Sequence, residues 1–255
     1  MRRLALKIQD IVDFEITDDM LWESIDARKG LQKALINQQN LLEKADPLPI
    51  STTHEVFSNN LGALPLTTHE LKEPIEALEI LYREIKNKVD HGEGVVEKGA
   101  PRILSLLPPH SSDPRWEHMI CELGIAPLAS ENNLFPIHGT RSLDLGQEKP
   151  KDPYEQLSQK LQISYYQNIS SRGAIIIEAC KRLNVDGVLA RSHVGCRAPA
   201  AGTLIVKGAI ESKLGIPVML MERDDFDPRS YNDEYKRQIE LFKDILNNSR
   251  KRKQS

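Results

Sequence analysis

The sequence contains few cysteines, few aromatic residues and no large excess of either charge. Of its 255 residues, three are cysteine and 5% are aromatic, and the formal net charge is −3. Without a basic excess, the chain has no overall field that would attract nucleic acid or anionic lipid. It also has no apolar run near the ~20 residues that span a bilayer. We therefore expect it to bind neither nucleic acid nor a membrane.

The cysteine pattern bears on the compartment. Cys121, Cys180 and Cys196 lie far apart in the sequence and form no C-x-x-C pair. Such an odd, sparse set fits reduced thiols better than a disulfide framework. The N-terminal segment MRRLALKIQDIVDFEITDD begins basic but soon turns acidic, unlike a secretory signal. These features predict a cytoplasmic protein.

Several common catalytic and nucleotide-binding motifs are missing. No G-x-G-x-x-G follows an expected strand, and neither a phosphate-binding G-x-x-x-x-G-K-[ST] loop nor a G-x-S-x-G or H-E-x-x-H motif occurs. A dinucleotide-binding site therefore has no support in the sequence, although the expected topology is Rossmann-like.

Residues 1–95 predict a helical arm. Thr17 can cap a helix whose apolar residues recur at helical spacing until Pro47 stops the pattern. Thr67 and Glu70 have the spacing of a capping box, which predicts that a second long helix begins there. Residues 91–94, with two glycines, predict a linker. The expected helices cover residues 18–46, 54–60 and 67–90.

After residue 95 the pattern changes to short buried strands that alternate with helices. Such alternation implies a parallel sheet with helices on both faces. The expected strands are 102–107, 125–129, 186–191 and 216–221, and the expected helices are 114–124, 152–161, 167–183, 202–214 and 231–246. The fold class is therefore α/β: a helical arm, a Rossmann-like domain over 96–248 with a roughly four-stranded parallel sheet, and a frayed basic tail over 249–255.

Parallel sheets of this kind bind ligands outside the carboxyl ends of their strands. These ends are followed by residues 107–110, 191–202 and 222–229. The segment RSHVGCRAPAAG, residues 191–202, places a thiol, an imidazole and two guanidiniums on one loop before a helix. Cationic neighbours and a helix N-terminus favour the thiolate of Cys196.

Three interpretations of Cys196 remain open from the residues alone. It is an iron–sulfur ligand, a nucleophile with His193 as its base, or a half-buried thiol in a tight turn without a chemical role. The carboxylates of Asp224–Asp227 also have two interpretations, since they could hold a cation or cap the final helix.

Three C-terminal runs carry a family resemblance. They are DGVLARSHVGCRAPAAG, LGIPVMLMERDDFDPR and YKRQIELFKDIL. Together they resemble the C-terminal domain of the 2-hydroxyacyl-CoA dehydratase and benzoyl-CoA reductase family, and within it the D-component of 2-hydroxyglutaryl-CoA dehydratase. Upstream, the helical arm and PRILSLLPPHSSDPRWEHMICELGIAPLA resemble the middle region of that family. Arg223 and Gln238 depart from the residues usual in the family, which are a small residue and an arginine.

The resemblance implies a cofactor and a reaction. Family subunits hold a 4Fe-4S cluster through three cysteines, and the last of these corresponds to Cys196, with Ser192 and Arg197 in the surrounding cofactor pocket. An ATP-driven activator protein supplies an electron that makes a radical from an acyl-CoA substrate, in anaerobic metabolism. The chain would then be part of a dehydratase (a lyase) or of an acyl-CoA reductase (an oxidoreductase).

The resemblance also implies a partner. The other two cluster cysteines of the family lie in an N-terminal domain, so a related dehydratase or reductase subunit, or a missing N-terminal half, is expected to supply them. The alternative is a non-catalytic partner subunit that binds acyl-CoA or a catalytic subunit and holds no cluster of its own.

Overall fold

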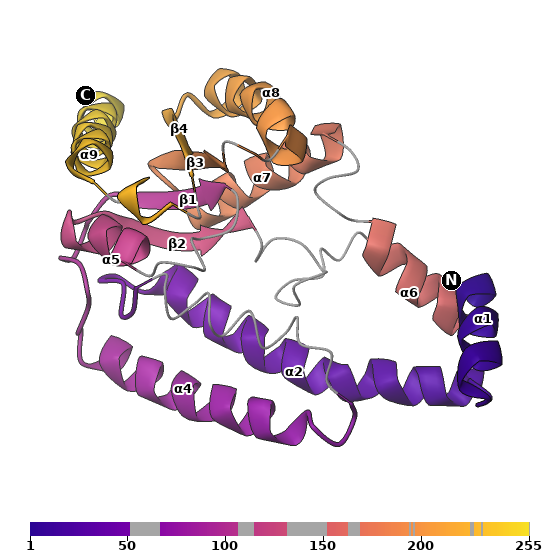
Figure 1. Cartoon of the computed structure of the whole chain (residues 1–255). Coiled ribbons are helices and arrows are strands. Elements are labelled where there is room, and N and C mark those ends of the chain that lie inside the picture. Colours follow the sequence, from indigo (N-terminus) through magenta and orange to yellow (C-terminus); the bar gives the residue numbers. More distant parts are fainter. Residues whose placement is uncertain are drawn as a thin grey trace.

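The computed structural model describes residues 1–51, 67–106, 115–131, 152–162, 169–193, 195, 197–224, 227–230 and 232–254. It has a helical N-terminal part and a parallel sheet with flanking helices (Figure 1). The expected α/β class and the four-stranded sheet are confirmed. The expected short helix at 54–60 lies outside the described residues, and the domain boundaries at 95/96 and 248/249 remain predictions.

The sheet is formed by four parallel strands in the order β2-β1-β3-β4. Each strand follows one of the apolar runs seen in the sequence. β1, β2 and β3 bury nearly every side chain, as expected for strands covered on both faces, whereas the edge strand β4 leaves Leu220 and Glu222 exposed. The strands are β1 (Arg102–Leu106), β2 (Ala126–Ser130), β3 (Gly187–His193) and β4 (Val218–Arg223). β3 and β4 each run two residues further than expected, so charged side chains join their carboxyl ends.

Helices cover the two faces of the sheet with separate cores. α7 (Ile169–Leu183) and α8 (Arg197–Leu214) pack on one face, where Val188 and Ala190 of β3 are buried. α5 (Arg115–Glu122) and α9 (Asp233–Gln254) pack on the other, where Leu189 of β3 and Met221 of β4 are buried. We call these the α7/α8 face and the α5/α9 face.

The N-terminal helices lie beside this sheet. α2 (Asp18–Lys44) and α4 (Lys72–Asp90) run side by side (Figure 1) around buried leucines such as Leu31, Leu35 and Leu78. Thr17 caps α2 as expected, since its Oγ1 accepts a hydrogen bond of 3.2 Å from the N–H of Met20. α1 (Arg2–Val12) and α6 (Pro153–Gln162) meet through Arg2, which donates to Asp152 at 3.1 Å.

Two polar contacts join α2 to the sheet. The buried amide of Gln39 donates to the carbonyl of Leu128 on the edge strand β2, at 3.2 Å. The Arg102 guanidinium, at the start of β1, donates to the carbonyls of Glu43 at 2.6 Å and Ala45 at 3.3 Å. These carbonyls belong to the end of α2, where no intrahelical donor remains. Partial burial lowers the pKa of Arg102.

The expected start of the second arm helix is wrong by several residues. Glu70 does accept hydrogen bonds from the N–H and the hydroxyl of Thr67, at 2.7 and 2.8 Å, but α4 begins only at Lys72. Pro74 explains the difference, because a helix begun at Thr67 would put this proline in its interior, without an N–H and against the carbonyl of Glu70. Beginning at Lys72 places Pro74 in the first turn, where it is tolerated.

Two C-terminal boundaries also differ from expectation. α8 begins at Arg197 rather than at Gly202, so its first turn includes Pro199. α9 continues to Gln254, and the frayed basic tail is therefore wrong for residues 250–254. Arg250 is fixed there, since it donates to the carbonyl of Gly99 at 2.8 Å and lies 3.5 Å from Asp186.

Candidate functional site at the carboxyl edge of the sheet

The topology defines one position where a ligand is expected. The connection after β1 runs through α5 on one face, whereas the connection after β3 runs through α8 on the other face. β1 and β3 are neighbours in the sheet. The chain therefore leaves these two strands in opposite directions, and such a switch point opens a crevice at the carboxyl edge of a parallel sheet.

Ser192 and His193 end β3 at this switch point. Ser192 is 6% exposed and follows Val188 and Ala190 on the α7/α8 face, since side chains alternate along a strand. His193 lies on the opposite face, and its Nδ1 is 3.9 Å from Oδ1 of Asp224. A side chain at Gly195 would come within 3.4 Å of Nε2 of His193, so the loop backbone passes close to the imidazole.

Cys196 lies outside the described residues, and so does the segment 107–110 that follows β1. What the structure does place is the helix after Cys196, because α8 begins at Arg197, the next residue in the sequence. The first N–H groups of a helix and its dipole favour an anion at this end. The structure begins this helix five residues earlier than expected, and the role of Cys196 remains a prediction.

A buried ion pair supports the first turns of α8. Arg172 of α7 donates to both carboxylate oxygens of Glu131, at 2.5 Å from Nε and 2.9 Å from Nη2, with both side chains almost fully buried. A side chain at Gly202 would come within 3.2 Å of Nη1 of Arg172. α8 thus packs closely over this guanidinium. The ion pair could not be predicted from local sequence patterns, because its partners are 41 residues apart.

Two further arginines are buried on the α5/α9 face at the same edge. Arg191 of β3 is 1% exposed and Arg223 of β4 is 5% exposed. The expected strand 186–191 ends on Arg191, whereas the expected strand 216–221 ends before Arg223 and so predicts that Arg223 lies in a loop. An apolar run leads directly into Arg191 (VLAR), which is a signal that could have indicated its burial, whereas Glu222 separates the apolar run from Arg223 (LMER).

The acidic segment after β4 makes local contacts. Arg229 donates to both oxygens of Asp227 at 2.6 to 2.9 Å, and these hydrogen bonds hold the pKa of Asp227 below its ordinary value. The cap of α9 is Asn232, whose Oδ1 accepts from the N–H of Tyr235 at 3.1 Å. The cap of α9 is therefore Asn232 and neither of the described carboxylates, Asp224 and Asp227, while the cation interpretation of the segment remains a prediction.

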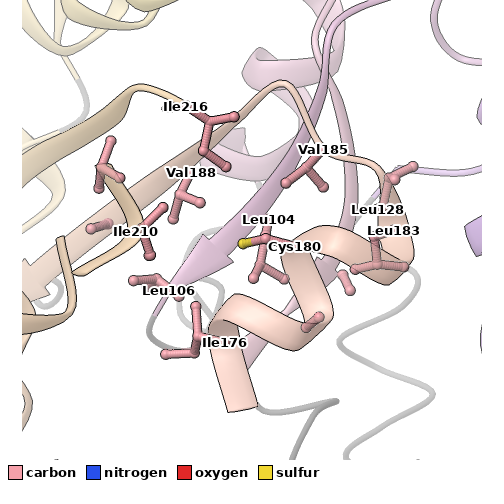
Figure 2. Packing of buried hydrophobic residues seen from close by; sticks show 14 of the residues in the cluster. Leu104, Leu106, Leu128, Ile176, Cys180, Leu183, Val185, Val188, Ile210 and Ile216 are labelled. Atoms are coloured by element: carbon pink, nitrogen blue, oxygen red, sulfur yellow. The ribbon is translucent and has the colours of Figure 1, made fainter. Parts of the chain in front are cut away.

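The other two cysteines lie away from this edge. Cys180 is buried among aliphatic residues of the α7/α8 face (Figure 2), and burial raises the pKa of its thiol to about 12. Cys121 lines a pocket of about 630 Å³ together with Pro101 and Gly124, which precede β1 and β2 at the amino edge. Among the described residues, no group of three His, Cys, Asp or Glu side chains could hold a metal ion. The described donors therefore do not fit a complete iron–sulfur site.

A parallel α/β sheet with a switch point at its carboxyl edge is the arrangement in which open α/β folds bind small-molecule ligands. A model of the family described as 2-hydroxyglutaryl-CoA dehydratase, D-component, matches residues 1–246. The chain belongs to this family, which confirms the resemblance seen in the sequence. A comparison with curated proteins finds no match. None of the described helices has the length and apolar character needed to cross a membrane.

Proposed function

We propose that this chain is a D-component subunit of a 2-hydroxyacyl-CoA dehydratase that works only together with another polypeptide. The family match over residues 1–246 supports the class of the subunit. The need for another polypeptide is supported by the positions of the thiols, because a four-iron cluster requires several cysteine ligands. Cys121 and Cys180 are both buried elsewhere in the fold.

In this proposal Cys196 supplies one thiolate to a 4Fe-4S cluster, and the partner supplies the other protein ligands. The observation that carries it is the start of α8 at Arg197, which puts a helix N-terminus directly after this cysteine. Ser192 and Arg197 are proposed to line the same pocket, since β3 ends beside Ser192 and α8 begins at Arg197. The cluster, when bound, supplies one-electron chemistry.

The residues of this chain would then bind and orient an acyl-CoA. The crevice between β1 and β3 receives the thioester end, and the buried Glu131–Arg172 pair keeps α8 in place beside it. We also propose that an ATP-driven activator reduces the assembled complex, and that the complex is cytoplasmic. A reductase of the benzoyl-CoA type is the related alternative reaction.

A second candidate function is a non-catalytic partner subunit that binds acyl-CoA or a catalytic subunit without holding a cluster. The burial of Cys180 and Cys121 favours it, because among the three cysteines only Cys196 is left for ligation. The two candidates differ in whether iron binding depends on Cys196.

Anaerobic reconstitution distinguishes them. Iron and sulfide per chain are measured for this protein alone and mixed with a family subunit that carries the two N-terminal cysteines. We expect a cluster with the absorption of a 4Fe-4S centre only in the mixture, and its loss in Cys196→Ser. Cys180→Ser is the matched control and should retain the cluster. No cluster in either sample, or a cluster unaffected by Cys196→Ser, would refute the ligand role.

A further inference from the structure

The first helix, α1, exposes an apolar face. Four of its aliphatic side chains recur at helical spacing on this face, and α1 has no buried residue. Their exposed fractions are 55% for Leu4, 41% for Ile8, 82% for Ile11 and 54% for Val12. Apolar side chains that gather on one exposed face mark a surface that binds a partner.

α1 is held to the rest of the molecule by a different side of the helix. Arg2 donates to Asp152 at 3.1 Å and lies over the ring of Tyr154, 4.4 Å from its centroid. Ala5 and Gln9, three and seven residues further along, are half-buried on this side. α1 lies at the end of α2 that is remote from the sheet (Figure 1), so its apolar face is presented at one end of the molecule.

The charges of α1 oppose its own helix dipole. Arg3 and Lys7 are in its first two turns, whereas Asp10 and Asp13 are at its end, and all four side chains are exposed. Cations near the N-terminus of a helix and anions near its C-terminus are unfavourable for that helix. An antiparallel neighbour of the same kind reverses this effect, because its acidic end lies beside the basic end of α1 and its dipole runs the opposite way. A second copy of α1 is such a neighbour.

We propose that this face binds the same face of a second copy of the chain, with the two α1 helices antiparallel. The two-fold axis passes between Ile8 and Gln9. Ile11 of each helix then lies level with the space between Leu4 and Ile8 of the other, so the aliphatic side chains interdigitate. None of these residues belongs to the carboxyl edge of the sheet, so the pairing goes beyond the proposed function and needs no cluster.

The same register places opposite charges beside each other. Arg3, Lys7 and Asp10 follow one flank of the apolar face, since they are spaced by four and three residues. An antiparallel pair brings the same flank of both helices together, so Lys7 of each copy lies level with Asp10 of the other. Each contact forms twice under two-fold symmetry. A parallel pair would instead bring the two lysines together, and like charges destabilise such a pair.

The test measures the oligomeric state of the full chain by sedimentation equilibrium. The concentration runs from about 5 to about 500 µM, because an interface as small as one short helix is weak. We expect a dimer that forms with increasing concentration in the wild type. Lys7→Glu and Asp10→Lys should each weaken it about tenfold or more, since each places like charges opposite one another twice.

A mixture of the two charge variants tests the antiparallel register directly. Equal amounts of Lys7→Glu and Asp10→Lys should form a heterodimer, because each variant supplies the charge that the other has lost. A contact of Lys7 with Asp10 in the same helix is not restored by mixing, so recovery of the dimer reports only the contact between copies.

Two further variants separate the apolar face from general effects. Ile11→Gln should weaken the dimer about tenfold or more without loss of stability, because this side chain is already 82% exposed in the single chain. Lys213→Glu reverses an exposed charge on α8 and should leave the dimer unchanged.

Three outcomes would overturn the proposal. The first is a wild-type protein that stays monomeric at about 500 µM, and binding of this monomer through Ile11 to vesicles of phosphatidylcholine and phosphatidylglycerol would assign the face to a lipid surface instead. The second is a dimer that Lys7→Glu, Asp10→Lys and Ile11→Gln all leave intact, because the copies would then meet elsewhere. The third is a mixture of the charge variants that remains as monomeric as each variant alone.

Discussion

Glu131 at the end of β2 and Arg172 in the first turn of α7 form a two-pronged ion pair that is almost completely buried, with side-chain exposures of 0% and 2%. Removal of one partner of a buried pair takes away the main opposite charge of the other, which typically costs about 3–5 kcal/mol. We therefore expect Arg172→Met to lower the free energy of unfolding by about this amount in urea denaturation. The double variant Glu131→Leu with Arg172→Met should recover much of the loss, since it leaves no charge behind.

The exposed pair Arg237–Glu234 provides the matched control for this experiment. Its side chains are 69% and 60% exposed, and such surface pairs contribute about 0–1 kcal/mol. Arg237→Met should therefore change stability little. Equal effects of Arg172→Met and Arg237→Met would contradict the structural role of the buried pair.

Gly187 is required at the start of β3 by close packing. A Cβ there would lie 2.4 Å from Cδ2 of Leu246 and 2.9 Å from the carbonyl oxygen of Pro217. Gly187→Ala should force α9 away from the sheet and reduce the free energy of unfolding by about 1–3 kcal/mol. Gly208→Ala, in an open position of α8, is the control and should raise stability by up to about 1 kcal/mol. A tolerated Gly187→Ala would show that α9 does not pack as closely as described.

Arg102 connects the end of α2 to the first strand. Arg102→Met removes both guanidinium hydrogen bonds to the carbonyls of Glu43 and Ala45, at a cost of about 1–3 kcal/mol. We expect faster amide hydrogen exchange over the last turn of α2 than in the wild type. Exchange in α4 provides the internal reference, because α4 makes no contact with this guanidinium among its described hydrogen bonds. Unchanged exchange at the end of α2 would contradict the role of Arg102.

The sheet was predictable because buried parallel strands leave a strong apolar signal. The apolar run VMLM, for example, predicts the strand β4. Gly124 and Gly215 predict the ends of α5 and α8, and both glycines adopt a positive φ there. The capping signal at Thr67 predicts the wrong start for α4, because Pro74 lies too close behind it for a helix that begins there. A local motif thus failed where a steric constraint a few residues away decided the outcome.

The candidate site was predictable only in part. The loop around Cys196 was found because its chemistry is concentrated in twelve consecutive residues, 191–202. The buried ion pair, and the shared face of Arg191 and Arg223, depend on contacts between segments that are far apart in the sequence. No short stretch of sequence therefore predicts them. Glu131 and Arg172 are adjacent only because β2 and α7 meet in space, and Arg191 and Arg223 share a face only through the register of two strands.

Cys180 should be the least reactive thiol in the folded protein. It is 3% exposed, and its pKa of about 12 leaves roughly one thiol in ten thousand ionised at pH 8. A colorimetric disulfide reagent should therefore label Cys180 only after denaturation, as peptide mapping would show. Cys180→Ala should not change the number of thiols that react in the folded state. Rapid labelling of Cys180 in the native protein would contradict its place in the core.

The same thiol makes stability depend on pH in the alkaline range. In the unfolded chain an ordinary thiol ionises near pH 8.5, whereas the folded state keeps the proton of Cys180 until about pH 12. Its contribution is therefore complete below pH 8.5 and is lost as the pH rises toward 12, because the unfolded state then binds fewer protons. The stability difference between wild type and Cys180→Ala should shrink by roughly 1–2 kcal/mol from pH 8 to pH 10 in urea denaturation. A difference that stays constant over this range would show that the thiol is hydrated in the folded state.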